Sequence, residues 1–231
     1  MNLSQLAFDL DPRPALGRED FLLAPGNRDA VSWIERWREW PDRAFAVYGA
    51  EGCGKTHLVH LWQGAAGAAV FDARALDAVD LPTLAGRTVA VEDGDRGLPE
   101  RAALHLLNLS RESGGYVLLT GRSPPARWPV ALPDLRSRLA AVAAVAIAPA
   151  DEALLGALLV KLFADRQLRV GDDVIPYLLA RMERSCAAAQ AMVAALDRAA
   201  LAGQRPIGLA LAREVLDGAD GGGQTPRLGS W

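Results

Sequence analysis

Hydrophobic residues follow two different patterns along the chain. Up to about residue 148, short apolar runs typical of buried parallel strands alternate with segments whose apolar residues recur at helical spacing. From Asp151 onwards only helical spacing is found. The predicted strands are Phe45–Tyr48, Ala68–Phe71, Thr88–Val91, Tyr116–Thr120 and Val142–Ile147. The predicted helices are Ala30–Trp40, Thr56–Gln63, Glu100–Arg111, Asp151–Ala164, Asp172–Arg181, Ser185–Leu201 and Ile207–Leu216.

This order of elements predicts an α/β domain followed by a small all-helical one. Strands that alternate with helices form a parallel sheet with both faces covered. We therefore expect a five-stranded parallel sheet within residues 21–148 and a helical domain at 149–217. A polar N-terminal tail, 1–20, and a glycine-rich, flexible C-terminal tail, 218–231, complete the predicted organisation.

Composition narrows the function classes. The net charge is −3, from 25 basic and 28 acidic residues, so no overall positive field favours direct sequence-specific DNA binding. Two cysteines, Cys53 and Cys186, are too few for a disulfide framework or a zinc site. Neither a secretory signal nor an apolar run of roughly 18 residues is found, so we expect a cytoplasmic protein without a membrane span.

Residues 49–56 read Gly-Ala-Glu-Gly-Cys-Gly-Lys-Thr, a phosphate-binding P-loop between a predicted strand and a predicted helix. Glycines let the main-chain amides converge on phosphate oxygens, while the lysine reaches the terminal phosphates and the threonine hydroxyl ligates Mg²⁺. The alternative, a glycine-rich turn without function, does not explain why strand, motif and helix agree. The predicted nucleotide-binding residues here are Gly49, Gly52, Cys53, Gly54, Lys55 and Thr56.

A carboxylate pair, Glu92 and Asp93, follows the strand Thr88–Val91. A P-loop site needs such a group to hold Mg²⁺ and to position a water molecule. We expect Glu92 to share the metal with Thr56 and Asp93 to act in catalysis, although both carboxylates could simply end a strand in a polar loop. Glutamate is one methylene longer than the usual aspartate, so we expect weak intrinsic hydrolysis and a nucleotide that acts more as a structural ligand.

Together with the P-loop, several segments resemble the AAA+ proteins of the DnaA branch, and most closely its Hda-type regulators of replication initiation. The similar segments are Phe21–Asn27, Leu104–Asn108, Leu119–Pro125 and Asp134–Leu139. The resemblance implies an AAA+ P-loop NTPase core with a helical lid, binding ADP or ATP with Mg²⁺. It places Asn27 beside the adenine and makes Thr120 the sensor 1 residue.

The segment Asp134–Leu139 is similar to the family's arginine-finger region, and Arg138 takes the finger position. A finger stabilises charge on a phosphate bound by a neighbouring subunit. The alternative is that Arg138 is a surface arginine paired with Asp134. Arg136 is interpreted as a neighbouring arginine without the finger role. Self-association into a homo-oligomer is left open.

The lid departs from the family. The sensor 2 arginine is expected early in the third lid helix, but that position falls on alanine within Arg184–Gln190. Arg184, one turn earlier, either reaches the phosphates instead or is a solvated helix residue. Without a sensor 2 contact to the last phosphate, we expect the protein to act mainly in an ADP-bound state.

The N-terminal segment Gln5–Leu10 is similar to the motif with which Hda-type proteins bind the sliding clamp, the β subunit of DNA polymerase III. Gln5 offers an amide, whereas Leu6, Phe8 and Leu10 are apolar side chains suited to a hydrophobic pocket. They could instead fold back onto the core. The helix-turn-helix domain with which DnaA binds DNA does not follow the lid, so we do not expect this chain to recognise origins.

The resemblance thus implies a negative regulator of replication initiation that inactivates DnaA by promoting hydrolysis of DnaA-bound ATP on the DNA-loaded clamp. Two alternatives remain open at this point. The chain could be a self-contained ATPase of the helicase-loader type, or a DnaA-like adaptor that binds partners without catalytic effect. His57 and His60 are interpreted as packing or surface residues because further metal ligands are missing.

Overall fold

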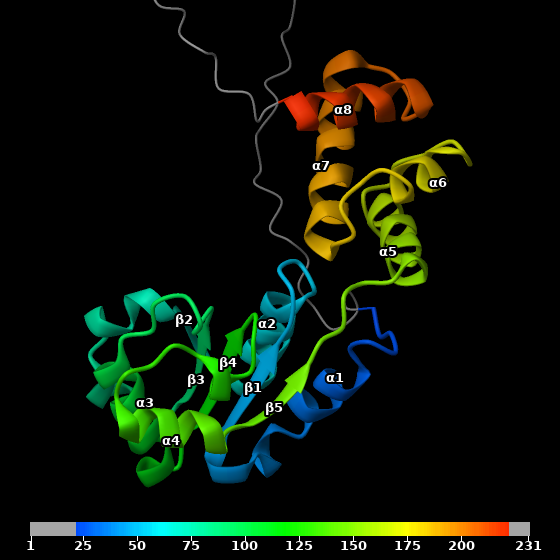
Figure 1. Cartoon of the computed structure of the whole chain (residues 1–231). Coiled ribbons are helices and arrows are strands. Elements are labelled where there is room, and N and C mark those ends of the chain that lie inside the picture. Colours follow the sequence, from blue (N-terminus) through cyan, green and yellow to red (C-terminus); the bar gives the residue numbers. More distant parts are fainter. Residues whose placement is uncertain (1–21, 222–231) are drawn as a thin grey trace, which may run out of the picture.

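The computed structural model describes residues 22–221, and Gln5–Leu10 therefore lies outside the described residues. A single five-stranded parallel sheet has the strand order β2-β3-β4-β1-β5 (Figure 1). Its strands are β1 (Ala44–Tyr48), β2 (Ala69–Asp72), β3 (Thr88–Glu92), β4 (Tyr116–Gly121) and β5 (Ala143–Ala146). All five predicted strands are confirmed, with ends that differ by at most one residue.

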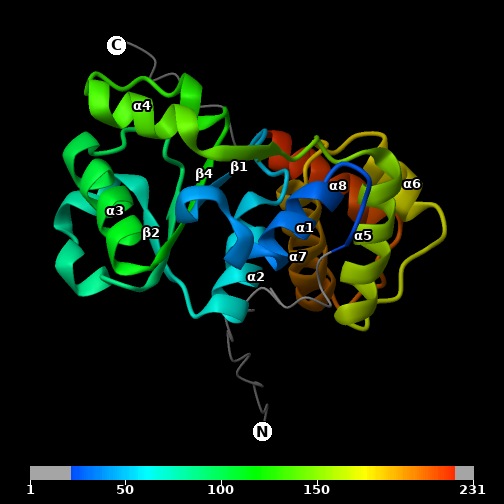
Figure 2. The same cartoon turned by 90° about the horizontal axis from the view of Figure 1, so that it is seen from below.

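Helices cover both faces of this sheet. They are α1 (Arg28–Glu35), α2 (Lys55–Ala66), α3 (Glu100–Ser113) and α4 (Pro133–Ala141). Alternate strand residues point to opposite faces: Phe45 and Val47 pack with α1 and α2, whereas Ala44 and Ala46 pack with α3 and α4. Figure 2 shows α3 and α4 apart from α1 and α2, with the strands between them. The predicted α/β fold class is confirmed.

The predicted helix Ala30–Trp40 is interrupted. The α-helix α1 ends at Glu35, and a 3-10 turn, Trp37–Glu39, follows. The indole N–H of Trp40 donates to the carbonyl of Trp33, the acceptor that an uninterrupted helix would offer to residue 37. In a 3-10 turn residues three apart eclipse each other, so Trp37 and Trp40 both reach the core, where each packs against Trp62.

The helical part contains α5 (Glu152–Asp165), α6 (Val174–Leu179), α7 (Cys186–Gly203) and α8 (Leu209–Gly221). These helices share a hydrophobic core of their own, which includes Leu155, Leu159, Val193 and Leu196. Figure 1 shows them gathered at one side of the α/β part, beyond β5. The helical character predicted from periodicity is confirmed, apart from one parallel bridge between Val170 and Ile207.

Other elements were not predicted. Helix α4 begins at Pro133 and buries only Leu135 and Leu139, so its apolar pattern is too short to be read as a helix. Short 3-10 helices occur at Pro41–Arg43, Ala73–Ala78, Leu81–Leu84 and Pro125–Arg127. Helix α8 continues to Gly221, past residue 217 where the lid was expected to end. No helix within residues 22–221 is long and apolar enough to cross a membrane.

Candidate nucleotide-binding site

The P-loop joins the end of β1 to the start of α2. Gly52 and Gly54 have φ angles of 72° and 105°, which a residue with a side chain adopts only under strain. At Gly49 a Cβ atom would lie 2.6 Å from the carbonyl oxygen of Ile147. Each of the three predicted glycines therefore occupies a position where backbone conformation or close packing excludes a side chain.

Lys55, the first residue of α2, carries a buried positive charge. Its side chain is 8% exposed, and its Nζ donates to the carbonyl oxygens of Gly49 and Ala50, both at 2.8 Å. No carboxylate among residues 22–221 forms an ion pair with it. Because a buried charge is unfavourable without a compensating partner, the site is suited to an anionic ligand.

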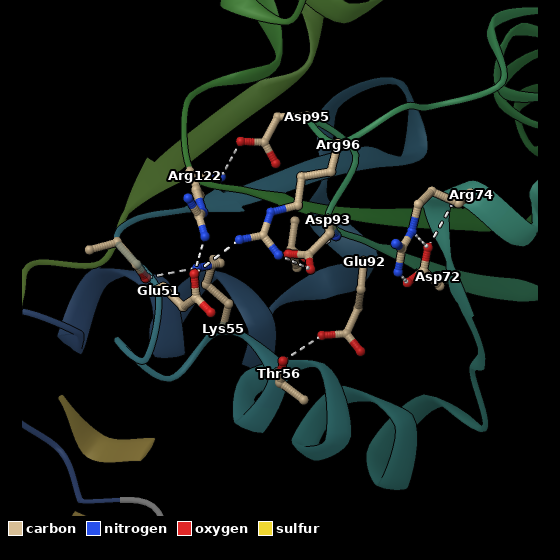
Figure 3. A network of polar contacts seen from close by, with 12 residues as sticks. Glu51, Lys55, Thr56, Asp72, Arg74, Glu92, Asp93, Asp95, Arg96 and Arg122 are labelled. Atoms are coloured by element: carbon tan, nitrogen blue, oxygen red, sulfur yellow. Dashed lines mark hydrogen bonds and ion pairs between the residues drawn. The ribbon is translucent and has the colours of Figure 1, made fainter. Parts of the chain in front are cut away.

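The predicted metal-binding pair lies close together. The hydroxyl of Thr56 donates to Oε1 of Glu92 at 2.7 Å, across the carboxyl ends of β1 and β3 (Figure 3). No cluster of three or more His, Cys, Asp and Glu side chains within residues 22–221 forms a metal site by itself. This arrangement fits Mg²⁺, which typically uses one or two protein oxygens and completes its shell with phosphate oxygens and water.

Asp93 and Thr120 are also brought together, but in different roles. Asp93 lines the pocket, with a φ of 55°, and its backbone N–H donates to Oγ1 of Thr120 at 3.2 Å. Thr120 is 1% exposed and is not among the pocket-lining residues. The threonine thus holds the turn that carries Asp93 and does not itself line the cavity.

A cavity of about 410 Å³ opens beside the loop, within the size range of ligand-binding pockets. Its wall combines the P-loop, the segment before α1, and the lid. Asn27 lies on this wall, where its side chain accepts from the N–H of Ala24 and donates to the carbonyl of Leu22. Asn27 therefore shapes the segment for which the resemblance implies a position beside the adenine. The wall also includes His57 and His60 from α2, which the sequence interpretation assigned to packing or to the surface.

The lid contacts the loop directly. The N–H of Cys186 donates to the carbonyl oxygen of Gly52 at 3.0 Å, and Ser185 caps α7 by accepting from the N–H of Ala188. Burial, together with the nearby Cys53 thiol, raises the pKa of Cys186, which keeps this thiol uncharged. Cys53 is itself buried in the loop and lines the cavity.

Arg184 does not line the cavity. It is exposed and forms an ion pair with Glu152 at 3.4 Å, on the lid itself. Ala187 and Gln190 of α7 line the cavity instead. Among the described residues of the lid, no arginine lines the cavity beside the P-loop.

Three charged residues that sequence reasoning missed lie at the cavity. They are Glu51 of the P-loop, Arg96 after β3 and Arg122 after β4 (Figure 3). Glu51 forms ion pairs with both arginines. We call these three residues, with Asp93, the rim cluster. The only sequence signal was the position of each residue just after a strand or inside the motif.

Arg138 lies elsewhere, on α4. It lines a shallow groove between α3 and α4 together with Asn108 and Asp134, and it is absent from the P-loop cavity. Among residues 22–221, none forms a hydrogen bond or ion pair with its guanidinium, so the alternative pairing with Asp134 is not observed. Arg136, by contrast, donates to the carbonyls of Val130 and Ala131.

Comparisons with known proteins agree with this architecture. Residues 152–216 match the family model of the Hda lid domain. Domain III of DnaA from Thermotoga maritima has a TM-score of 0.76 at 17% identity, over 89% of this chain and 97% of that one. AMPPCP-bound DnaA from Aquifex aeolicus has a TM-score of 0.64 at 18% identity, and the match covers 78% of this chain and 64% of that one. The RuvB Holliday junction branch migration motor of T. maritima has a TM-score of 0.66 at 13% identity, and the match covers 87% of this chain and 71% of that one.

The sheet order, the P-loop and the helical lid define a P-loop protein with the AAA+ fold, as the DnaA and RuvB structures show. Within this fold, residues 152–216 match the Hda lid domain, and the chain shares the fold of DnaA domain III.

Proposed function

We propose that this protein inactivates the replication initiator DnaA by promoting hydrolysis of DnaA-bound ATP. In this proposal DnaA supplies the nucleotide and the magnesium site, and this chain supplies Arg138 in trans while it is bound to the DNA-loaded sliding clamp. An arginine finger of this kind accelerates hydrolysis by about 1000-fold or more.

The observation that carries the proposal is the position of Arg138. Its guanidinium has no partner among the described residues and lies outside the chain's own nucleotide cavity. A guanidinium without a partner in a groove between two helices favours an interface, because an anionic group of another molecule could pair with it.

The chain's own P-loop is proposed to bind an adenine nucleotide with Mg²⁺. The buried Lys55, the Thr56–Glu92 pair and the cavity support this assignment, and related DnaA structures contain AMPPCP. When bound, Mg²⁺ would neutralise charge on the phosphates. No arginine of the described lid residues lines the cavity, which favours a stable ADP-bound form and weak intrinsic hydrolysis.

The proposed role of Arg138 as an arginine finger is tested by measuring whether DnaA carries ATP or ADP. DnaA loaded with labelled ATP is mixed with this protein and clamp-bearing DNA, and conversion to ADP is followed for the wild type, Arg138→Ala and Arg138→Lys. We expect Arg138→Ala to lose about 1000-fold and Arg138→Lys to recover little, because lysine lacks the planar fork. Arg136→Ala is the matched control on the same helix and should retain most activity. Equal hydrolysis with Arg138→Ala would contradict the mechanism.

Clamp binding is a separate part of the proposal, because Gln5–Leu10 lies outside the described residues. Calorimetry with the sliding clamp should detect binding that is lost in a Leu6→Ala, Phe8→Ala double variant. Persistence of full affinity in that variant would remove the motif from the proposal.

A further inference from the structure

The rim cluster connects three segments that are distant in sequence. Nη2 of Arg96 lies 3.0 Å from Oε2 of Glu51, and Arg122 pairs with the same oxygen (Figure 3). Arg96 also lies 3.4 Å from Asp93. A P-loop side chain thus holds two guanidinium groups from the ends of β3 and β4.

The backbones of both arginines are fixed, whereas their side chains reach solvent. The N–H of Arg122 donates to Oδ2 of Asp95, and the N–H of Arg96 donates to the carbonyl of Asp93, both at 2.9 Å. The side chains of Arg96 and Arg122 are 40% and 48% exposed, and that of Glu51 is 72% exposed. Because exposed ion pairs are weak, a stronger anion can replace the Glu51 carboxylate.

Both arginines line the same cavity as Lys55 and Thr56. P-loop amides hold the inner phosphates and the lysine reaches the outer ones. The ends of β3 and β4 lie beside the end of β1, since β4 pairs with both β1 and β3. A group at these strand ends is therefore well placed for the outermost phosphate, in a cavity that no arginine of the lid lines within the described residues.

We propose that Arg96 and Arg122 bind the γ-phosphate of ATP in exchange for Glu51, and so make the site sensitive to the number of phosphates. With ADP, the arginines remain paired with Glu51. With ATP, the γ-phosphate accepts their N–H groups and Glu51 turns to solvent. The inference rests on the proposed nucleotide binding by this chain and adds a cationic pair supplied from the α/β part.

The exchange is tested by calorimetric titration of the full chain with Mg·ATP and with Mg·ADP. Because charge-assisted hydrogen bonds are strong, Arg122→Ala should weaken ATP binding roughly 10- to 100-fold, and Arg96→Ala should also weaken it. In both variants the ADP affinity should change less than about 3-fold. Glu51→Gln removes the competing carboxylate, so it should tighten ATP binding by about 3- to 10-fold and leave ADP unchanged.

Controls separate this inference from loss of folding. Arg74→Ala removes an arginine that pairs with Asp72 outside the cavity and should leave both affinities unchanged. Arg122→Lys keeps the charge and should recover part of the ATP affinity. In the double variant Glu51→Gln, Arg122→Ala the gain from Glu51→Gln should shrink, because the two residues are coupled.

The outcomes are distinct. If the wild type binds neither nucleotide, the proposed nucleotide site itself is wrong. A second outcome is that the wild type binds both nucleotides while the arginine variants keep the wild-type ratio of ATP affinity to ADP affinity. In that case the γ-phosphate assignment is overturned, both when the two affinities are unchanged and when they are weakened equally. A selective loss of ATP binding supports it.

Discussion

The backbone N–H of Cys186, the first residue of α7, donates to the carbonyl oxygen of Gly52 in the P-loop at 3.0 Å. The lid is thus joined to the phosphate-binding loop through main-chain atoms. A Cβ atom on Gly52 would lie only 2.5 Å from Cβ of Ser185. The position of the lid and the shape of the loop therefore depend on the same glycine.

The first prediction concerns this contact. Gly52→Ala combines a φ of 72° with a clash against Ser185, so it should strain the loop by about 1–3 kcal/mol and weaken nucleotide binding roughly 10-fold or more. The control is Gly64→Ala in α2, where an added Cβ meets nothing within 4 Å. This substitution should stabilise the helix by about 0.5–1 kcal/mol. Nucleotide titration and thermal unfolding measure both effects. Unchanged affinity in Gly52→Ala would contradict the coupling of lid and loop.

The second prediction concerns Mg²⁺. The 2.7 Å contact between the Thr56 hydroxyl and the Glu92 carboxylate places the two proposed magnesium ligands together. Thr56→Val and Glu92→Gln should each weaken the affinity for Mg²⁺ in the nucleotide complex by about 10-fold or more. The measurement is nucleotide affinity as a function of free Mg²⁺, with a chelator as the zero point. If both variants show the magnesium dependence of the wild type, the pair does not hold the metal.

The third prediction concerns the segment before α4. The Glu100 carboxylate accepts from the N–H groups of Ala131 and Leu132 at 2.7 and 2.6 Å, and these bonds hold the pKa of Glu100 below its ordinary value of 4.5. A lowered folded-state pKa contributes stability that is present above the unfolded pKa and is lost as pH falls through the folded pKa. Glu100→Gln should therefore lower the melting temperature at neutral pH and flatten its fall below pH 4.5.

A matched variant sharpens this test. The Arg74 side chain, followed by its backbone N–H, lowers the pKa of Asp72 to about 2. Asp72→Asn should therefore flatten the fall in melting temperature between pH 3.8, the ordinary pKa of the group, and about pH 2. If Glu100→Gln has the pH dependence of the wild type, the two backbone hydrogen bonds do not stabilise the segment that leads to Arg138.

Sequence patterns predicted the strands, most of the α-helices and the P-loop because these depend on local spacing. Each strand is a short apolar run, and the loop motif lies between its own strand and helix. The rim cluster could not be predicted in this way. Glu51 is separated from Arg96 by 45 positions in the sequence and from Arg122 by 71. Only the order of the strands in the sheet brings these side chains together.

Two further features show the same limit. The break in the helix after Glu35 depends on the Trp40 indole bonding to the Trp33 carbonyl, a contact that periodicity does not reveal. Arg184 is near the position where the resemblance implies a sensor 2 residue, yet its side chain pairs with Glu152 of α5 and does not line the cavity. Neither contact can be read from local spacing.

We propose that this protein promotes hydrolysis of ATP bound to DnaA and not of ATP bound to this chain. The direct measurement is single-turnover hydrolysis with labelled ATP loaded either on DnaA or on this protein, in the presence of clamp-bearing DNA. We predict fast hydrolysis of the DnaA-bound ATP that is lost in Arg138→Ala and kept in Asp93→Asn, with slow turnover of the ATP on this chain. Fast turnover of this chain's own ATP, abolished by Asp93→Asn, with DnaA-bound ATP unaffected, would contradict the account.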